Sequence, residues 1–422
     1  MIMPKKTRLR RHAAAIWPAL ILVFAPAFAA QGTQNPPPGL SLAQAVETAL
    51  ARHPDVLMAQ QAAKAAAGRR LQAEARPDPS LSLDTLGIPW TLKSGDSTPE
   101  YSLGLEQTIE FPGRRAARVE IAKLDEESAG LEIERIRLLI AARVRKAYSR
   151  AVLAERTLAA TEPLGGLLDR FLEAMTIRFQ SGDAAYGDIL RARVEKARLQ
   201  NRLIEARREQ AAARGELLLL IGLSPDEPIR LTDDAGYKPF GPTLAQVLEA
   251  ARAGRPSLRL ARLRASRAEA ETRLAALAGK PDFSAGLFVP SKSVRGWGVS
   301  FGLSLPLSRR RTEGIRAEAS AARETSLIGS AALDRRLTVL IGTAYADMRS
   351  AEEQVKVFEQ KLLSEIEAEI GNGLEQYRLG RIESYALLDL YRALSEARLE
   401  HLHSLYLYAA SLADLEAAGE DY

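Results

Sequence analysis

The chain has 422 residues, of which 46 % are hydrophobic, 6 % are aromatic and none is cysteine. The lack of cysteine excludes disulfides, thiolate metal sites and an acylated amino-terminal cysteine, and the abundance of Ala, Leu, Arg and Glu is typical of long helices. The formal net charge is +5, but 58 basic residues less the five in residues 1–29 leave 53, equal to the 53 acidic residues. A balanced chain lacks the basic excess that nucleic-acid binding needs, so we expect no nucleic-acid partner.

Residues 1–29 have the pattern of an export signal. A basic start precedes the apolar run 13–24, and a small-x-small cleavage site follows at 27–29. The run is shorter than the roughly 20 apolar residues of a membrane-spanning helix. We therefore expect the signal to be removed, which leaves a flexible segment over 30–40.

The rest of the chain contains one pattern twice, with an offset of about 200 residues. Four landmarks recur in the same order: 41–47 at 243–249, 76–78 at 280–282, 111–115 at 305–309, and 178–182 at 376–380. Chance similarity does not produce four landmarks in order. We predict a first repeat over 41–222, a linker over 223–242, a second repeat over 243–418 and a tail over 419–422.

Each repeat is predicted to contain four helical stretches around one β-hairpin. A short helix and one of roughly 23–25 residues precede the hairpin, and a very long stretch and a helix of roughly 38 residues follow it. The long stretches end at Gly182 and Gly380, because glycine suits a helix C-terminus, and Pro163 is expected to kink the first. The shorter helices together match the long one in length, which favours end-to-end stacking in a tube of helices. A long solvent-exposed coiled coil is the alternative.

The hairpins, predicted over 79–111 and 282–307, favour a membrane location. In 101–111, 282–289 and 296–307 apolar side chains alternate with small or polar ones. Such segments are typical of transmembrane β-barrels, although half-buried strands of a soluble sandwich give the same alternation. The Ser80–Pro89 strand changes phase, so we expect a bulge there.

Aromatic residues flank the predicted strands as membrane girdles do. The girdle candidates are Trp90, Tyr101 and Trp297 at the loop ends, and Phe111 and Phe283 at the opposite ends. Four strands cannot close a barrel, and an open edge is not tolerated in lipid. Closure therefore requires other subunits, and a trimer would supply twelve strands.

The sequence offers no catalytic or cofactor site. His401 and His403 are two residues apart and lie on different faces of a helix, so they are poor joint metal ligands. Phosphate-binding glycine loops and the HExxH and GxSxG motifs are absent. We expect no enzyme activity, no cofactor and no metal. The arginine run 309–311 is expected at the junction of barrel and periplasm, in contact with solvent or lipid headgroups.

This layout resembles the TolC-type outer-membrane efflux channel family. The residues that carry the resemblance are the Leu-Ala-Gln openings at 42–44 and 244–246, the two glycine turns, and the segments 188–192 and 387–390, which are similar to the family's Gly…Asp-Val-Leu-Asp-Ala pattern. The segment 106–115 is similar to the cation-efflux branch of the family.

The resemblance implies a homotrimer with a twelve-stranded barrel in the outer membrane and a helical tunnel across the periplasm. It also implies docking to a periplasmic adaptor and an inner-membrane pump, which we expect to be of the RND type. Within the channel class, drug efflux and metal-cation efflux are both open as substrate classes. Alternatives are the outer-membrane channel of a type I protein secretion system and, in a different class, a periplasmic coiled-coil structural protein.

The resemblance also carries over candidate residues at the closed tips of the tunnel. For the periplasmic gate, Asp188 and Asp389 match family aspartates, and Arg191 stands where the first repeat would have its second aspartate. The candidates for adaptor docking at the tips are Arg178, Gly182, Tyr377 and Gly380.

Overall fold

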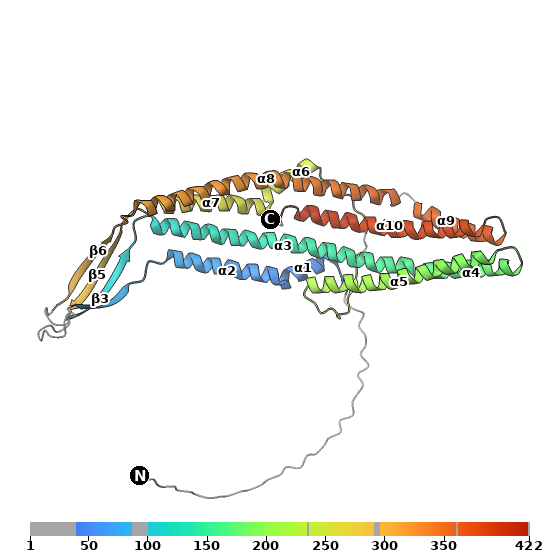
Figure 1. Cartoon of the computed structure of the whole chain (residues 1–422), viewed down its shortest axis with the longest axis horizontal. Helices are drawn as coiled ribbons and strands as arrows, with labels where there is room; N and C mark the ends of the chain where they lie inside the picture. The colour runs from blue at the N-terminus through green and yellow to red at the C-terminus, as the bar shows by residue number, and fades with distance from the viewer. Residues whose placement is uncertain (1–38, 87–99, 234–235, 291–295, 360–361, 421–422) are drawn as a thin grey trace, which may run out of the picture.

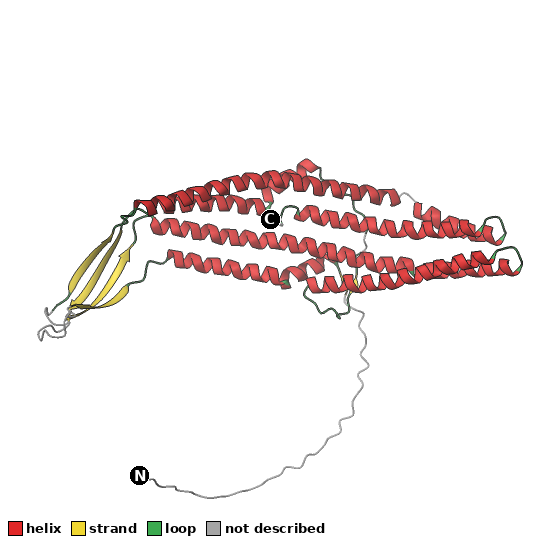
Figure 2. Ribbon diagram, in the orientation of Figure 1, coloured by secondary structure: helices red, strands yellow, loops and turns green. Residues whose placement is uncertain are grey.

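The computed structural model describes residues 39–86, 100–233, 236–290, 296–359 and 362–420. The predicted export signal and the girdle candidate Trp90 lie outside these residues. A long body of helices carries a small β-sheet at one end and two helix-to-helix turns at the other (Figures 1 and 2). The C-terminus lies near the middle of the body.

The described elements follow the predicted order. In sequence they are β1 (Gly39–Leu40), α1 (Leu42–Arg52), α2 (Pro54–Glu74), β2 (Ser80–Leu86), β3 (Glu100–Ile109), α3 (Arg114–Thr161), α4 (Pro163–Gln180), α5 (Tyr186–Leu220), β4 (Arg230–Leu231), α6 (Leu244–Gly254), α7 (Pro256–Ala276), β5 (Asp282–Pro290), β6 (Gly298–Ser304), α8 (Arg309–Glu359), α9 (Leu362–Arg378) and α10 (Ser384–Ala417).

The short helices begin at matching caps. Ser41 caps α1 and Thr243 caps α6. Each hydroxyl accepts a hydrogen bond from the backbone amide of the glutamine three residues later, and the side-chain oxygen of that glutamine accepts one from the backbone amide of the cap residue. Such a capping box satisfies two amides that a helix end leaves unpaired. A proline then opens each following helix, α2 and α7, where its missing N–H costs nothing.

The helices lie side by side in rows. On the sheet side, α3 packs between α2 and α7, and α7 packs between α3 and α8. On the side of the turns, α10 takes the place of α7 between α3 and α8, while α5 lies along α3 and α4. Stacking of shorter helices beside long ones is therefore present in the structure, as the helix lengths predicted.

The first long helical stretch is interrupted near its proline. The interruption falls at the proline expected to kink this stretch, because α3 ends at Thr161 and α4 begins at Pro163, with Glu162 between them still in helical geometry (φ −57°, ψ −45°). In the second half α8 ends at Glu359 and α9 begins at Leu362. Residues 360–361 between them lie outside the described residues.

The four strands β2, β3, β5 and β6 form one antiparallel sheet in that order. The two hairpins are joined by β3 and β5, where Leu105 pairs with Leu287. Pairing of β2 with β3 runs without interruption from Ser80–Glu106 to Leu86–Glu100. The prediction of a bulge in Ser80–Pro89 is therefore wrong for the described part of that strand, since β2 keeps one register with β3 up to Leu86.

Three connecting segments are more ordered than the sequence suggested. Residues 39–40, expected within a flexible segment, form β1 and pair in parallel with β4 of the predicted linker. In the predicted tail, the Glu420 side chain is fully buried and accepts hydrogen bonds from the Ser257 amide (3.2 Å) and hydroxyl (3.1 Å). These contacts fasten the end of the chain to the start of α7.

Alanine and leucine dominate the buried positions. One cluster near the turns is centred on Phe171, Met175 and Tyr377, and others lie in the middle of the body around Ile140 and Met348. Small side chains let long helices approach closely over many turns. Among the described helices, none combines the length and apolar character needed to cross a membrane.

Candidate channel elements

One face of the sheet is apolar and exposed. Antiparallel partners share a face, so the register places on it a continuous set of side chains that are between 45 % and 83 % exposed: Leu81, Leu83, Tyr101, Leu103, Leu105, Ile109, Phe283, Leu287, Val289, Val299, Phe301 and Leu303. Such a surface is unfavourable in water and needs a cover.

The opposite face is built from small and polar residues. It contains Ser80, Ser82, Asp84, Ser102, Gly104, Glu106, Thr108, Ser284, Gly286, Ser300, Gly302 and Ser304. Phe288 also lies on this face, and its ring fills the space that a side chain at Gly298, its cross-strand partner, would occupy. A Cβ at Gly298 would lie 2.5 Å from the ring. The sheet is thus apolar on one face and hydrophilic on the other, as the alternation predicted.

The described girdle candidates lie at both ends of this sheet. Tyr101 and Phe283 are on the apolar face near strand ends, and Trp297, 74 % exposed, immediately precedes β6. Phe111 lies two residues after β3 ends, in the turn before α3, with the Lys280 ammonium 5.8 Å from its ring centroid. Their role as a membrane girdle stays a prediction.

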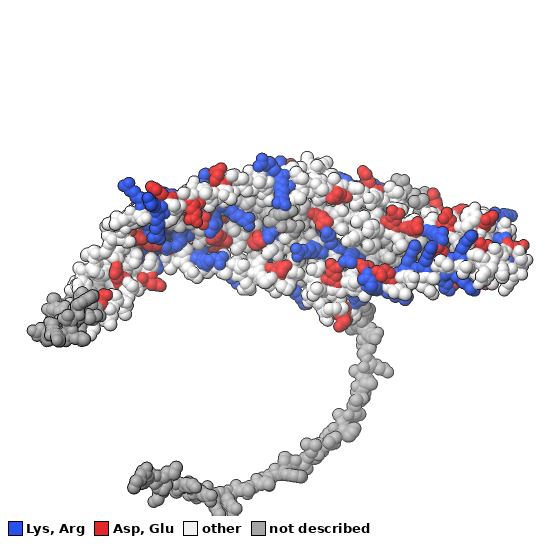
Figure 3. All heavy atoms as spheres, in the orientation of Figure 1, with Lys and Arg blue, Asp and Glu red and all other residues white. Residues whose placement is uncertain are grey.

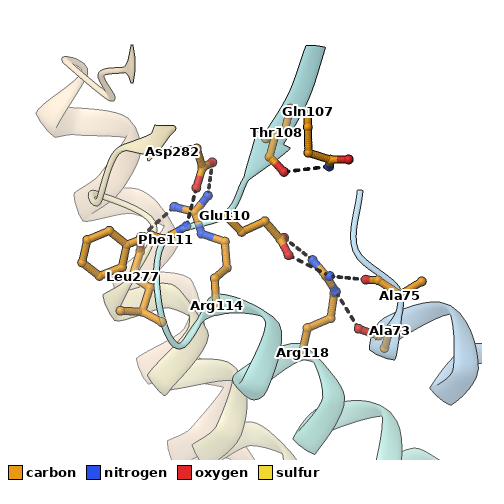
Figure 4. A network of polar contacts seen from close by, with 10 residues as sticks. All are labelled: Ala73, Ala75, Gln107, Thr108, Glu110, Phe111, Arg114, Arg118, Leu277 and Asp282. Atoms are coloured by element: carbon orange, nitrogen blue, oxygen red, sulfur yellow. Dashed lines mark hydrogen bonds and ion pairs between the residues drawn. The ribbon is translucent and has the colours of Figure 1, made fainter. Parts of the chain in front are cut away.

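The sheet is fixed to the helices by a polar network that crosses the two halves (Figure 4). The Arg114 guanidinium, in the first turn of α3, pairs with the Asp282 carboxylate at the start of β5 and donates to the Leu277 and Lys280 carbonyls, each at 3.0 Å. Asp282 also accepts from the Phe111 amide at 2.9 Å. These bonds set the direction in which the sheet leaves the body.

A second arginine secures the other side of the same junction. Arg118 pairs with the Glu110 carboxylate and donates to the Ala73 and Ala75 carbonyls at the end of α2. Glu110 is the last polar residue before the turn, so this pair ties the end of β3 to both α2 and α3. Sequence reasoning missed these contacts.

The two turns at the far end of the body have the same geometry. Gly182 and Gly380 have positive φ angles of 86° and 74°. In each turn the glycine amide donates three residues back and the next amide donates five residues back. This is the Schellman arrangement, which favours glycine because a Cβ is strained at positive φ. The prediction that glycines end both helices is confirmed.

The docking candidates bring the two turns together. The Arg178 guanidinium, at the end of α4, stacks on the Tyr377 ring of α9 at 4.8 Å and donates to the Tyr377 carbonyl at 3.1 Å. Tyr377 is 1 % exposed, and its hydroxyl finds no hydrogen-bond partner among the described residues. Burial raises the pKa of Tyr377, Arg178 lowers it and the nearby Asp188 raises it.

The gate candidates do not bridge the halves within one chain. Asp188 lies 3.5 Å from Arg191, one turn along the same helix, and the Arg191 side chain is 64 % exposed. Asp389 is exposed on α10 and forms no ion pair within the described residues. A role in gating for these three residues stays a prediction.

An ion pair between the halves is instead made by Glu195, which sequence reasoning missed. Glu195 is 5 % exposed on α5, and its carboxylate accepts from Arg392 Nε of α10 at 3.0 Å and from Arg198 of its own helix at 2.8 Å. The hydrogen bond to Glu195 raises the pKa of Arg392. One sequence signal existed, because Glu195 continues the buried stripe of Ala192 and Leu199.

Charges are distributed unevenly along the molecule. On the face seen in Figure 3, Lys, Arg, Asp and Glu intermix along the helical body, while the sheet carries few charged side chains. In the described part of the chain, no three His, Asp or Glu side chains are grouped so that they could hold a metal ion.

Comparison with known proteins shows a similarity to one family. Residues 45–223 match a family model described as "Outer membrane efflux protein". Over these residues the chain is similar to the outer membrane efflux protein family. No curated protein matches it in sequence.

Solved structures resemble the fold over nearly the whole chain. The CusC crystal structure has a TM-score of 0.76 and 19 % identity, and the alignment covers 89 % of this chain and 91 % of CusC. VceC of Vibrio cholerae has a TM-score of 0.74 and 18 % identity, with 89 % of this chain and 94 % of VceC covered. The CmeC outer membrane channel of Campylobacter jejuni has a TM-score of 0.74 and 15 % identity, with 90 % of this chain and 86 % of CmeC covered. At these identities the likeness concerns the fold.

Proposed function

We propose that this protein is the outer-membrane channel of a tripartite efflux system, a passive duct rather than an enzyme. One observation carries the proposal: the sheet at the end of the helical body has an exposed apolar face opposite a face of Ser, Gly and Thr. A membrane covers the first face and a water-filled lumen suits the second. A periplasmic coiled-coil structural protein would have no use for such a sheet.

The proposed channel is a homotrimer. Strands β2 and β6 are the edges of the four-stranded sheet, and unpaired strand edges are not tolerated in lipid. Three copies joined edge to edge would close a twelve-stranded barrel, and the helical rows would continue it as a tunnel in the periplasm. The matching caps, proline starts and glycine turns of the two halves support an internal duplication with the repeat bounds given above.

We place the gate and the adaptor contacts at the two turns, farthest from the sheet. Asp188, Arg191 and Asp389 would face their symmetry copies there, with Glu195 and Arg392 holding the two turns of each chain together. Arg178, Gly182, Tyr377 and Gly380 shape the surface on which a periplasmic adaptor would dock. An inner-membrane pump of the RND type would supply the driving force.

For the substrate class we favour metal cations. The support is the similarity of 106–115 to the cation-efflux branch. Deleting the gene should lower the minimum inhibitory concentration of divalent metal salts more than that of dyes or antibiotics. The reverse order, or loss of a secreted protein, would instead assign drug efflux or type I secretion.

The barrel is tested by labelling single cysteines, because the chain has none of its own. Ser102→Cys and Leu103→Cys are neighbours in β3 on opposite faces, and Val299→Cys and Ser300→Cys form the same kind of pair in β6. In outer-membrane fractions, a charged maleimide should react with the serine-derived cysteines, which face the lumen. The other two should react only after denaturation, since lipid covers them.

The pairs control for each other, because neighbours share depth and strand. Equal labelling of both members of a pair in the native state would refute the membrane barrel. Each variant should first be recovered in the outer-membrane fraction at the level of the unsubstituted chain, which excludes misfolding as the cause of reactivity.

A further inference from the structure

Three consecutive arginines open α8 immediately below the sheet. Arg309, Arg310 and Arg311 are all exposed, and the first turn of the helix contains no acidic residue. Glu313 is the first carboxylate of α8, yet within the described residues no ion pair engages any of the three guanidinium groups. Figure 3 shows Lys and Arg side chains gathered at this end of the body, where the sheet begins.

The run directly follows the apolar face of β6. Leu305 and Leu307 continue the alternation beyond the strand and are 58 % and 84 % exposed. The chain therefore changes from exposed leucines to exposed arginines within a few residues. Side chains in this order fit the boundary of a membrane, where apolar groups contact acyl chains and long basic side chains reach the headgroups.

The first half shows that such a cluster is not needed to build the junction. There the chain passes from β3 to α3 with Arg114 and Arg118, which form ion pairs within the chain with Asp282 and Glu110. The arginines of α8 have no such partner among the described residues. They contribute little to the fold by pairing and are available to an external anion.

We propose that Arg309, Arg310 and Arg311 bind the headgroups of acidic phospholipids, of the phosphatidylglycerol class, in the leaflet next to the helical body. The inference rests on the proposed membrane barrel and adds the lipid partner. Guanidinium groups donate two parallel hydrogen bonds to a phosphodiester. In a trimer, three copies of the run would form a basic collar around the base of the barrel.

The expected preference follows from the number of charges. A basic residue at an anionic membrane surface contributes about 1 kcal/mol, which corresponds to roughly fivefold in affinity. Three arginines should therefore favour phosphatidylglycerol over phosphatidylcholine on the order of 100-fold. The preference should decrease with added salt, because exposed charges are screened.

The test is native mass spectrometry of the full-length protein, extracted in detergent and supplied with equal amounts of dioleoyl-phosphatidylglycerol and dioleoyl-phosphatidylcholine. The measured quantity is the ratio of the two lipids retained. In R309Q/R310Q/R311Q this ratio should fall by on the order of 100-fold. The control R193Q/R335Q/R381Q removes three exposed arginines, two on helices and one in the turn after α9, that form no ion pair within the described residues. It should keep the ratio of the unsubstituted protein.

An unchanged ratio in the first variant, or an equal fall in the control, would overturn the proposal. Displacement of phosphatidylglycerol by millimolar inorganic phosphate would also overturn it, because the site would then recognise a free anion. Equal melting temperatures of both variants in phosphatidylcholine establish that they are folded. A chain found only in the soluble fraction would refute the proposed function itself, whereas a trimer without headgroup preference would refute this inference alone.

Discussion

Replacing Glu195 with glutamine should loosen the contact between the two helix turns. The Glu195 carboxylate is almost fully buried and is the acceptor that joins α5 to Arg392 of α10. Glutamine keeps the size of the side chain and removes its charge. The helices α4 and α5 should then separate more readily from α9 and α10, and a closed channel should open more often.

The free-energy cost of removing this ion pair depends on how exposed the pair is to solvent. Removing one partner of a fully buried ion pair costs about 3–5 kcal/mol, and exposed pairs contribute about 0.2–1 kcal/mol. The Arg392 side chain is 45 % exposed, so we expect an intermediate cost of about 1–2 kcal/mol. This cost corresponds to roughly 5-fold to 30-fold faster local opening.

The assay is amide hydrogen exchange across the two turns, combined with single-channel conductance in a planar bilayer. Arg392→Gln should accelerate exchange as much as Glu195→Gln does. The double variant should accelerate it little more than either single variant, because all three remove the same ion pair. Arg198→Gln is the matched control, since Arg198 donates to the same carboxylate from within α5. Equal acceleration by Arg198→Gln, or no acceleration by Glu195→Gln, would refute the reasoning.

Three further predictions concern stability, measured by denaturation of the detergent-solubilised protein. Gly380→Ala should lower the free energy of unfolding by about 1–2 kcal/mol because φ is positive there. Gly371→Ala within α9 should raise it by about 0.5–1 kcal/mol. Arg114→Met should cost about 2–3 kcal/mol by leaving its carboxylate partner unpaired, and Arg115→Met, at an exposed site, should cost little. Burial raises the pKa of Glu420, so stability should decline as pH rises through its folded-state pKa, and Glu420→Gln should remove that decline.

Each of these predictions has a result that contradicts it. Equal effects at the two glycines would mean that backbone strain does not set the turn. Equal losses at the two arginines would remove the special role of the junction pair. For the pH dependence, Glu416→Gln is the control, because this side chain is 44 % exposed; a loss of pH dependence there as well would contradict the assignment to Glu420.

Local signals in the sequence predicted the elements well. Alternation over 101–111 identified the apolar face of β3, Pro163 marked the break between α3 and α4, and Gly182 and Gly380 marked the turns. Each of these signals acts within a few residues, through side-chain direction, a missing amide or a positive φ.

Contacts between distant residues were not predictable in the same way. Glu195 and Arg392 meet because α5 and α10 are brought together by the whole fold, and the pairing of Arg114 with Asp282 likewise joins the two halves. The burial of Glu420 depends on the start of α7, 163 residues earlier in the sequence.

The central claim is that copies of this chain close a barrel in the outer membrane. Its most direct test is the native mass of the protein after detergent extraction from the outer-membrane fraction. We predict a particle of three chains that is recovered only when detergent is added. A monomer or dimer that is soluble without detergent would contradict the barrel, and the channel function with it.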